Sequence, residues 1–170
     1  YRRLGASWIE PGYDGSGLSR QNRNSPFELV LVARHIYDSP YRDYLLSALP
    51  VSGKSGTLRH RSFTRQGSRV VAKTGTLSGV SALTGFILDK DGKPSQVFSI
   101  IGNAPKETDG RLSMRINDLM RLLIKKVDTL PEDHRLAHID TQEHADADDI
   151  DTQVALDTTD NAHDTSMLFN

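Results

Sequence analysis

The sequence predicts an α+β fold, an antiparallel sheet with flanking helices. Three observations predict it. Three strand candidates follow one another between helical segments, and the turn sequence at residues 89–93 joins the last two into a hairpin. No alternation of strands and helices indicates a parallel sheet. We expect these elements within residues 1–130 and a disordered acidic tail over 131–170.

The helices come first in chain order. Ser25 is a suitable cap, followed by Pro26 at the first helical position and Glu28 in the first turn, so a helix should run over Pro26–Tyr37. A second, short helix is expected over residues 41–48. A third should span 110–127, and its buried stripe would contain Leu112, Ile116, Leu119, Met120 and Leu123.

The strands are expected over residues 69–76, 81–88 and 95–102. The first is short and partly β-branched, the second is apolar up to the turn, and the third is rich in Val, Phe and Ile.

The first 134 residues are basic overall, and the remaining residues form an acidic tail; we call residues 1–134 the body. The net charge of −1 hides twenty Lys and Arg against thirteen acids in residues 1–134, and one Arg against nine acids in 135–170. The tail also carries His134, His138, His144 and His163, but their spacing fits no compact ligand set. A solvated tail is favoured over a weak metal site. We therefore predict no metal and no cofactor.

Composition excludes some functions. There is no cysteine, which rules out disulfides and thiol catalysis. No apolar run reaches the eighteen residues of a membrane span, so we expect no transmembrane segment in this chain. The sequence begins at Tyr1 without a signal peptide, and we expect the true N-terminus to lie upstream.

The triplet Lys73-Thr74-Gly75 lies at the end of the first predicted strand. In β-lactamases and penicillin-binding proteins such a triplet borders the active-site cleft on an edge strand. There the lysine supplies positive charge near the nucleophile and the substrate carboxylate, the threonine donates a hydroxyl proton to that carboxylate, and the glycine leaves room for a peptide. The alternative is an ordinary strand end with a solvated lysine.

Two further segments contain glycine and serine. Asp14-Gly15-Ser16-Gly17-Leu18-Ser19-Arg20 predicts a tight loop with positive φ. Residues 49–59 include Gly53-Lys54-Ser55, which suggests a phosphate-binding loop. Such a loop needs a glycine where this chain has Ala48, and no strand precedes it, so we exclude nucleotide binding.

Taken together and in this order, the three segments resemble the low-molecular-mass penicillin-binding proteins of the D-Ala-D-Ala carboxypeptidase/endopeptidase family (peptidase family S13, class C). The resemblance covers roughly residues 1–128, through residues 14–19, 49–58, 72–77 and 81–86. It implies the C-terminal part of the penicillin-binding/serine β-lactamase-like transpeptidase fold.

The resemblance also implies roles for residues. Lys73, Thr74 and Gly75 would be the third family signature, and the backbone N–H of Thr76 would contribute to the oxyanion hole. Four further residues would lie near the pocket for the stem peptide: Gly17, Leu18, Ser19 and Arg20. The guanidinium of Arg20 would pair with an acidic side chain of the peptide.

Two family signatures are missing. No serine stands three residues before any lysine, so the nucleophile motif Ser-x-x-Lys is absent, and Ser-x-Asn is absent as well. We expect both upstream of Tyr1 and predict that this chain is inactive alone. The parent protein would be a serine carboxypeptidase of the periplasm or cell envelope. It would act on peptidoglycan stem peptides ending in D-Ala-D-Ala and be acylated by β-lactam antibiotics.

Two other classes of function stay open. One is a noncatalytic module that binds peptidoglycan peptides. The other is a nucleic-acid binder that uses the basic body, but the sequence has no recognised motif of aromatic and basic residues, and we predict no nucleic-acid partner.

Overall fold

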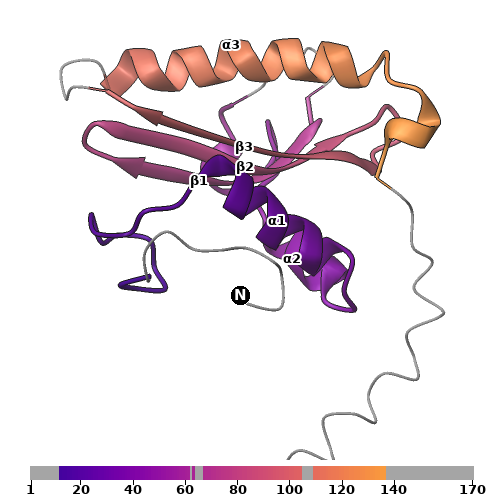
Figure 1. Ribbon diagram of the computed structural model, residues 1–170. Helices are drawn as coiled ribbons and strands as arrows, with labels where there is room; N and C mark the ends of the chain where they lie inside the picture. The colour runs from indigo at the N-terminus through magenta and orange to yellow at the C-terminus, as the bar shows by residue number, and fades with distance from the viewer. Residues whose placement is uncertain (1–11, 62, 64–66, 105–108, 137–170) are drawn as a thin grey trace, which may run out of the picture. The chain divides into compact units, whose positions relative to one another are not determined.

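The computed structural model describes residues 12–61, 63, 67–104 and 109–136 (Figure 1). The elements predicted from the sequence are confirmed, with ends that move by a few residues. In chain order they are α1 (Pro26–Tyr37), α2 (Arg42–Ala48), the 3₁₀ helix η2 (Gly56–Leu58), β1 (Val70–Leu77), β2 (Val80–Leu88), β3 (Pro94–Asn103), α3 (Asp109–Val127) and the 3₁₀ helix η4 (Glu132–His134).

The three strands form one antiparallel sheet in the order β1-β2-β3. Thr74 of β1 pairs with Leu83 of β2, which pairs in turn with Ile100 of β3. The predicted hairpin between β2 and β3 is confirmed. Asp89 closes its turn by accepting hydrogen bonds from the backbone N–H groups of Asp91 and Lys93, both at 2.9 Å. The fold class is therefore the one that the sequence predicts.

Helices cover both faces of this sheet (Figure 1). On the α3 face, buried side chains of the strands pack against Ile116, Met120, Ile124 and Val127 of α3. On the other face, Tyr37 of α1 stacks against Phe86 of β2 with ring centroids 5.4 Å apart. A Cβ on Gly85 would lie 2.2 Å from the Val71 carbonyl oxygen, so this central strand position requires glycine.

The predicted stripe of α3 is wrong at one position. Leu119 is 42% exposed, whereas Ile124 and Val127, which we did not include, are buried. Met120 occupies the centre of the buried stripe, and one residue along a helix turns the side chain by about 100°. Leu119 is therefore rotated out of the interface.

The cap predicted for α1 is confirmed as a capping box. The backbone N–H of Glu28 donates to Ser25 Oγ at 3.2 Å, and the backbone N–H of Ser25 donates to Glu28 Oε2 at 2.7 Å. The first turn of the helix is thereby fixed.

Residues 131–136, which we assigned to the acidic tail, pack against the sheet. Leu136 is 6% exposed, and its backbone N–H donates to the Ser95 carbonyl at 2.8 Å. Apolar burial and this hydrogen bond hold the segment. The rest of the predicted tail, with three of its four histidines, lies outside the described residues.

Within the described residues, no helix is both long and apolar enough to cross a membrane. Over the same residues, no group of three or more His, Asp or Glu side chains could hold a metal ion.

Candidate functional site

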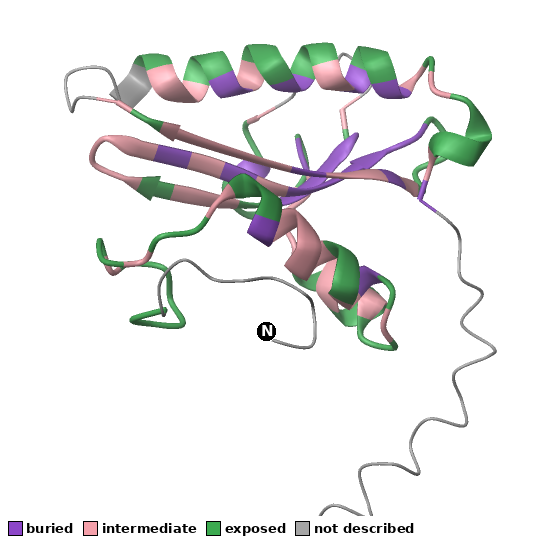
Figure 2. Ribbon diagram, in the orientation of Figure 1, coloured by how far each residue is buried: buried purple, intermediate pink, exposed green. Residues whose placement is uncertain are grey.

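The strand β1 (Val70–Leu77) is buried up to Ala72 and becomes more exposed from Lys73 onward. Its first three residues, Val70, Val71 and Ala72, are buried, while Lys73 and Thr76 are exposed (Figure 2). One strand thus joins the core to the surface, and its polar residues all follow the core residues.

Another segment of the described chain covers the outer edge of β1 over this buried part. There, Ala72 N–H donates to the Pro50 carbonyl at 3.0 Å, and Ser52 N–H donates to the Val70 carbonyl at 2.9 Å. The contact is an antiparallel bridge between Val51 and Val71. Among the described residues, no segment pairs with the edge beyond Ala72. We call residues 73–76 of β1 the open edge.

The direction of the backbone groups on the open edge follows from this pairing. In an antiparallel strand, alternate residues direct their N–H and C=O groups to the same side. Val70 and Ala72 direct theirs to the outer side, so Thr74 and Thr76 must do the same. The open edge therefore offers N–H and C=O groups to an added strand. The predicted donor, the Thr76 N–H, is one of them.

The side chains of the triplet have near neighbours in the chain itself. Lys73 Nζ donates to the Thr74 carbonyl at 2.5 Å, and Thr74 Oγ1 donates to Thr57 Oγ1 at 2.9 Å. A Cβ on Gly75 would lie 3.3 Å from Ala82 Cβ, so the position has little space. Sequence reasoning did not identify Thr57. Its only signal was its place in the segment of residues 49–58, to which we gave no role.

Asp14 organises the loop that precedes α1, which we call the glycine loop (residues 14–20). Its carboxylate accepts hydrogen bonds from Ser16 Oγ at 2.7 Å and from the backbone N–H groups of Leu18 and Ser19, both at 3.0 Å. The Ser16 hydroxyl, and then the Asn22 amide, lower the pKa of Asp14 from 3.8 to about 2, because they stabilise the charged form. Gly17 has a φ of 77°, which confirms the predicted positive-φ turn.

Arg20 connects the glycine loop to the far end of β1. Its Nη1 and Nη2 atoms both donate to the Ser78 carbonyl at 3.2 Å, in the turn between β1 and β2. The structure therefore brings the two groups of predicted site residues to the same end of the sheet. The partner of Arg20 here is a backbone carbonyl, and the predicted pairing with an acidic substrate side chain stays a prediction.

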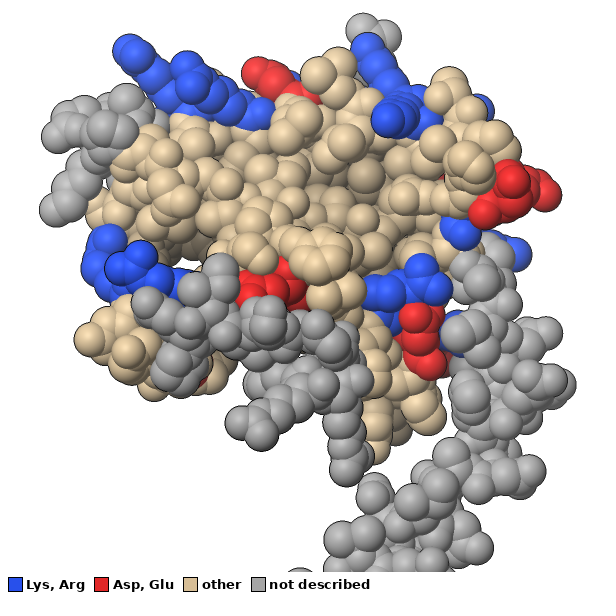
Figure 3. All heavy atoms as spheres, in the orientation of Figure 1, with Lys and Arg blue, Asp and Glu red and all other residues tan. Residues whose placement is uncertain are grey.

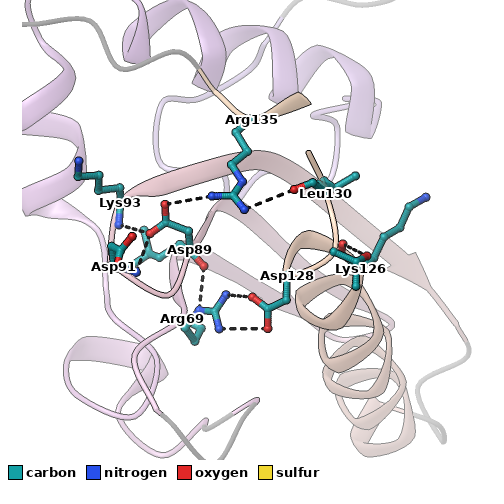
Figure 4. Close-up of polar contacts among 10 residues, drawn as sticks. Arg69, Asp89, Asp91, Lys93, Lys126, Asp128, Leu130 and Arg135 are labelled. Atoms are coloured by element: carbon teal, nitrogen blue, oxygen red, sulfur yellow. Dashed lines mark hydrogen bonds and ion pairs between the residues drawn. The ribbon is translucent and has the colours of Figure 1, made fainter. Parts of the chain in front are cut away.

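The buried end of β1 carries a different polar cluster (Figure 4). Arg69, just before the strand, donates from Nε to the Leu88 carbonyl at 2.8 Å and forms an ion pair with Asp128 at 2.6 Å. Arg135 Nη2 donates to the Leu130 carbonyl at 3.3 Å, and Arg135 Nη1 lies 4.0 Å from Asp89 Oδ2. These contacts tie the end of α3 and residues 130–136 to the sheet. The cluster therefore has a structural role.

The antiparallel sheet with flanking helices and the triplet on its edge strand is the arrangement expected for the C-terminal part of the penicillin-binding and serine β-lactamase-like transpeptidase fold. Residues 13–126 match the D-Ala-D-Ala carboxypeptidase 3 (S13) family, and the chain belongs to that family.

Curated relatives agree with this assignment. The chain is 40% identical over 120 residues to penicillin-sensitive carboxypeptidase A of Dictyostelium discoideum, which covers 66% of this chain and 23% of the relative. It is 36% identical over 114 residues to the D-alanyl-D-alanine carboxypeptidase of Actinomadura sp. strain R39, which covers 61% of this chain and 21% of the relative. The chain thus spans about a fifth of the length of these relatives.

A solved structure shows the same fold. Penicillin binding protein 4 of Haemophilus influenzae superimposes with a TM-score of 0.59 at 24% identity, over 76% of this chain and 30% of that one.

Proposed function

We propose that this chain forms the C-terminal part of the active site in a serine-type D-Ala-D-Ala carboxypeptidase/endopeptidase that acts on peptidoglycan stem peptides. The observation that carries the proposal is the open edge of β1, which holds Lys73-Thr74-Gly75 and lies at the same end of the sheet as the glycine loop. Membership of the S13 family supports the same reaction.

The open edge supplies the alignment of the substrate. The end of the stem peptide lies along residues 73–76 and pairs with the outward backbone groups of Thr74 and Thr76. The Thr74 hydroxyl donates to the terminal carboxylate, and the Lys73 ammonium adds positive charge beside it. The Thr76 N–H, together with the N–H of the nucleophilic serine, stabilises the oxyanion.

The glycine loop supplies part of the stem-peptide pocket. Residues 17–19 are held by hydrogen bonds to Asp14, so the loop has a defined shape before substrate arrives. Arg20 then offers a guanidinium to an acidic side chain of the stem peptide.

The nucleophile belongs to residues outside this chain. In the intact protein, the serine of a Ser-x-x-Lys motif attacks the penultimate D-Ala carbonyl, the terminal D-Ala leaves as the free amino acid, and water hydrolyses the resulting ester. The 170 residues contain neither Ser-x-x-Lys nor Ser-x-Asn, so we expect the chain alone to be inactive. Its short coverage of the curated relatives supports this division.

β-Lactams acylate the same serine under this proposal. Penicillin binding protein 4 of Haemophilus influenzae has also been solved in complex with a β-lactam, and that structure superimposes on this chain with a TM-score of 0.54 at 26% identity. Membership of the S13 family supports a parent protein in the periplasm or cell envelope, where peptidoglycan is found.

The direct test is the release of D-alanine from a synthetic stem peptide that ends in D-Ala-D-Ala. The full-length protein that contains this chain should release D-alanine, and prior treatment with penicillin should abolish the release. A matched peptide that ends in L-Ala-L-Ala is the control and should stay intact. A folded full-length protein that leaves the D-Ala-D-Ala peptide intact would contradict the proposal.

A noncatalytic peptidoglycan-peptide-binding module is the second candidate, favoured by the absence of Ser-x-x-Lys from these residues. It predicts that the full-length protein binds the stem peptide, as calorimetry would show, without release of D-alanine.

The charge distribution on one face of the molecule gives little support to nucleic-acid binding. On the face shown in Figure 3, Lys and Arg side chains lie in separate groups with acidic and uncharged residues between them. A continuous basic stripe would be the expected footprint. Binding of DNA that weakens with salt would be the cheap test of this alternative.

A further inference from the structure

The segment of residues 49–58, which we call the edge segment, is fastened to β1 where the open edge begins. Its two backbone hydrogen bonds to Val70 and Ala72 are joined by a third contact, in which Val70 N–H donates to Ser52 Oγ at 3.1 Å. Ser52 is fully buried. Each of these contacts reduces the freedom of the edge segment to move along or away from the strand.

The edge segment is also closed upon itself. Gly53 N–H donates to the Leu58 carbonyl at 2.9 Å, and Val51 N–H donates to Ser55 Oγ at 3.0 Å. Gly56 has a φ of 52°, and a Cβ there would lie 2.9 Å from Pro50 Cγ, so the turn before Thr57 requires glycine. A short, tightly bonded loop of this kind fixes the residue at its tip.

Thr57 stands between two anchors. Gly56 sets the turn before it, and Leu58 after it is fully buried in the core that faces α3. The Thr57 side chain itself is exposed, and its Oγ1 accepts the hydrogen bond from Thr74 Oγ1 at 2.9 Å. The buried structure therefore places one hydroxyl directly beside the hydroxyl of the triplet.

From this geometry we propose that Thr57 is a positioning residue for the reaction: it holds the Thr74 hydroxyl in the rotamer that receives the terminal carboxylate of the substrate. The inference rests on the proposed function and gives the edge segment a role that its sequence did not reveal.

The physical reason lies in the rotamers of threonine. The χ1 torsion of Thr74 has staggered wells that place Oγ1 in different positions, and the branched Cβ makes each well stiff. A hydrogen bond to a fixed acceptor favours the well seen here. When a carboxylate arrives, the Thr74 hydroxyl proton rotates toward it and the Thr57 hydroxyl donates to Thr74 Oγ1 in its place, so the oxygen stays where it is. Pre-positioning reduces the ordering cost of binding and of the transition state.

The experiment compares Thr57→Val, which keeps the shape but removes the hydroxyl, with Thr57→Ser, which keeps the hydroxyl. The full-length protein is used, with D-alanine release and the second-order rate of acylation by a fluorescent penicillin as readouts. We expect Thr57→Val to lower both rates about fivefold, as one hydrogen bond of modest net strength would. Thr57→Ser should restore most of the rate.

Two comparisons separate positioning from a general structural effect. A stem-peptide analogue whose terminal carboxylate is replaced by an amide should be processed equally by wild type and Thr57→Val. In a Thr74→Val background, Thr57→Val should cause no further loss, because the hydroxyl that it positions is gone. Thr129→Val, at an exposed threonine after α3, is the matched control and should leave the rates unchanged.

The outcomes also separate this inference from the proposed function. If wild type shows neither acylation nor D-alanine release, both are wrong. If wild type is active and Thr57→Val matches it, or loses activity equally on the amide substrate, the role of Thr57 alone is wrong. Loss in Thr57→Val, rescue in Thr57→Ser and no loss on the amide would together support it.

Discussion

The two ends of β1 differ in burial: the first is enclosed in the core and the second lies at the surface. At its start, Arg69 is 5% exposed and its charge is matched by Asp128 and by a carbonyl, within a core of apolar side chains. At its end, Lys73 and Thr76 are exposed, and within the described residues no second strand pairs with the outward backbone groups. The same strand thus serves as scaffold over three residues and, under the proposed function, as a binding edge over the next four.

Because of this difference, we expect mutations at the buried end to change stability and mutations at the open edge to change binding. Changes at the buried end remove partners that water cannot replace, so they act on stability. Changes at the open edge leave the core as it is and act on what binds there. The edge segment links the two ends, because its backbone pairs with the first part of β1 and its Thr57 side chain contacts Thr74 of the open edge.

The largest expected effect is at the buried end. Arg69→Met would leave Asp128, whose side chain is 26% exposed, without its cation, and we expect a loss of about 3 kcal/mol in the free energy of unfolding. Urea unfolding of the full-length protein measures this. Arg121→Met is the matched control, because its ion pair with Asp118 is exposed and should be worth less than about 1 kcal/mol. Equal losses in the two variants would remove the contrast between the ends of β1.

The next effect concerns function at the open edge. Thr74→Val should slow acylation by β-lactam and by stem peptide about tenfold to a hundredfold, because a donor to a carboxylate is lost. The melting temperature should stay within a degree or two of wild type, since the Thr74 side chain lies at the surface end of the strand. Stopped-flow acylation and thermal unfolding supply the two numbers. An unchanged acylation rate would remove Lys73-Thr74-Gly75 from the site.

The smallest effect is local and depends on pH. Asp14 has a pKa of about 2, below its ordinary value of 3.8, so its charged form is the one that binds the glycine loop. The contribution is fully present above pH 4 and is lost as the pH falls through about 2. Amide chemical shifts of Leu18 and Ser19 should therefore show Asp14 still largely ionised at pH 3. A titration midpoint near 3.8 would contradict the hydrogen-bonded loop, and Asp14→Asn should abolish the titration.

Much of the fold could be predicted because its signals are local. The cap at Ser25 and the turn at residues 89–93 each act within a few residues, and both are found in the structure. Leu119 was wrong because a one-residue shift of the apolar stripe is small in sequence but turns the side chain out of the interface. Residues 131–136 were assigned to the tail because composition does not show that Leu136 finds a place beside Ser95.

The candidate site residues were named from motifs in the sequence, but the contacts that they make in the structure were not predicted. The triplet and the glycine loop were found by motif, and their residue roles stay predictions. What the sequence could not show is the hydrogen bonds that connect distant segments, from Arg20 to Ser78 and from Thr74 to Thr57. These depend on how the edge segment and the glycine loop pack beside β1, which no local pattern encodes.

Under the proposed function, the open edge of β1 completes a penicillin-reactive site whose serine lies outside residues 1–170. The most direct measurement is the intact mass of the full-length protein before and after penicillin, followed by mapping of the modified peptide. We predict one added penicillin per protein, on the serine of a Ser-x-x-Lys motif outside this chain. No added mass, or an adduct on a residue within 1–170, would contradict the account.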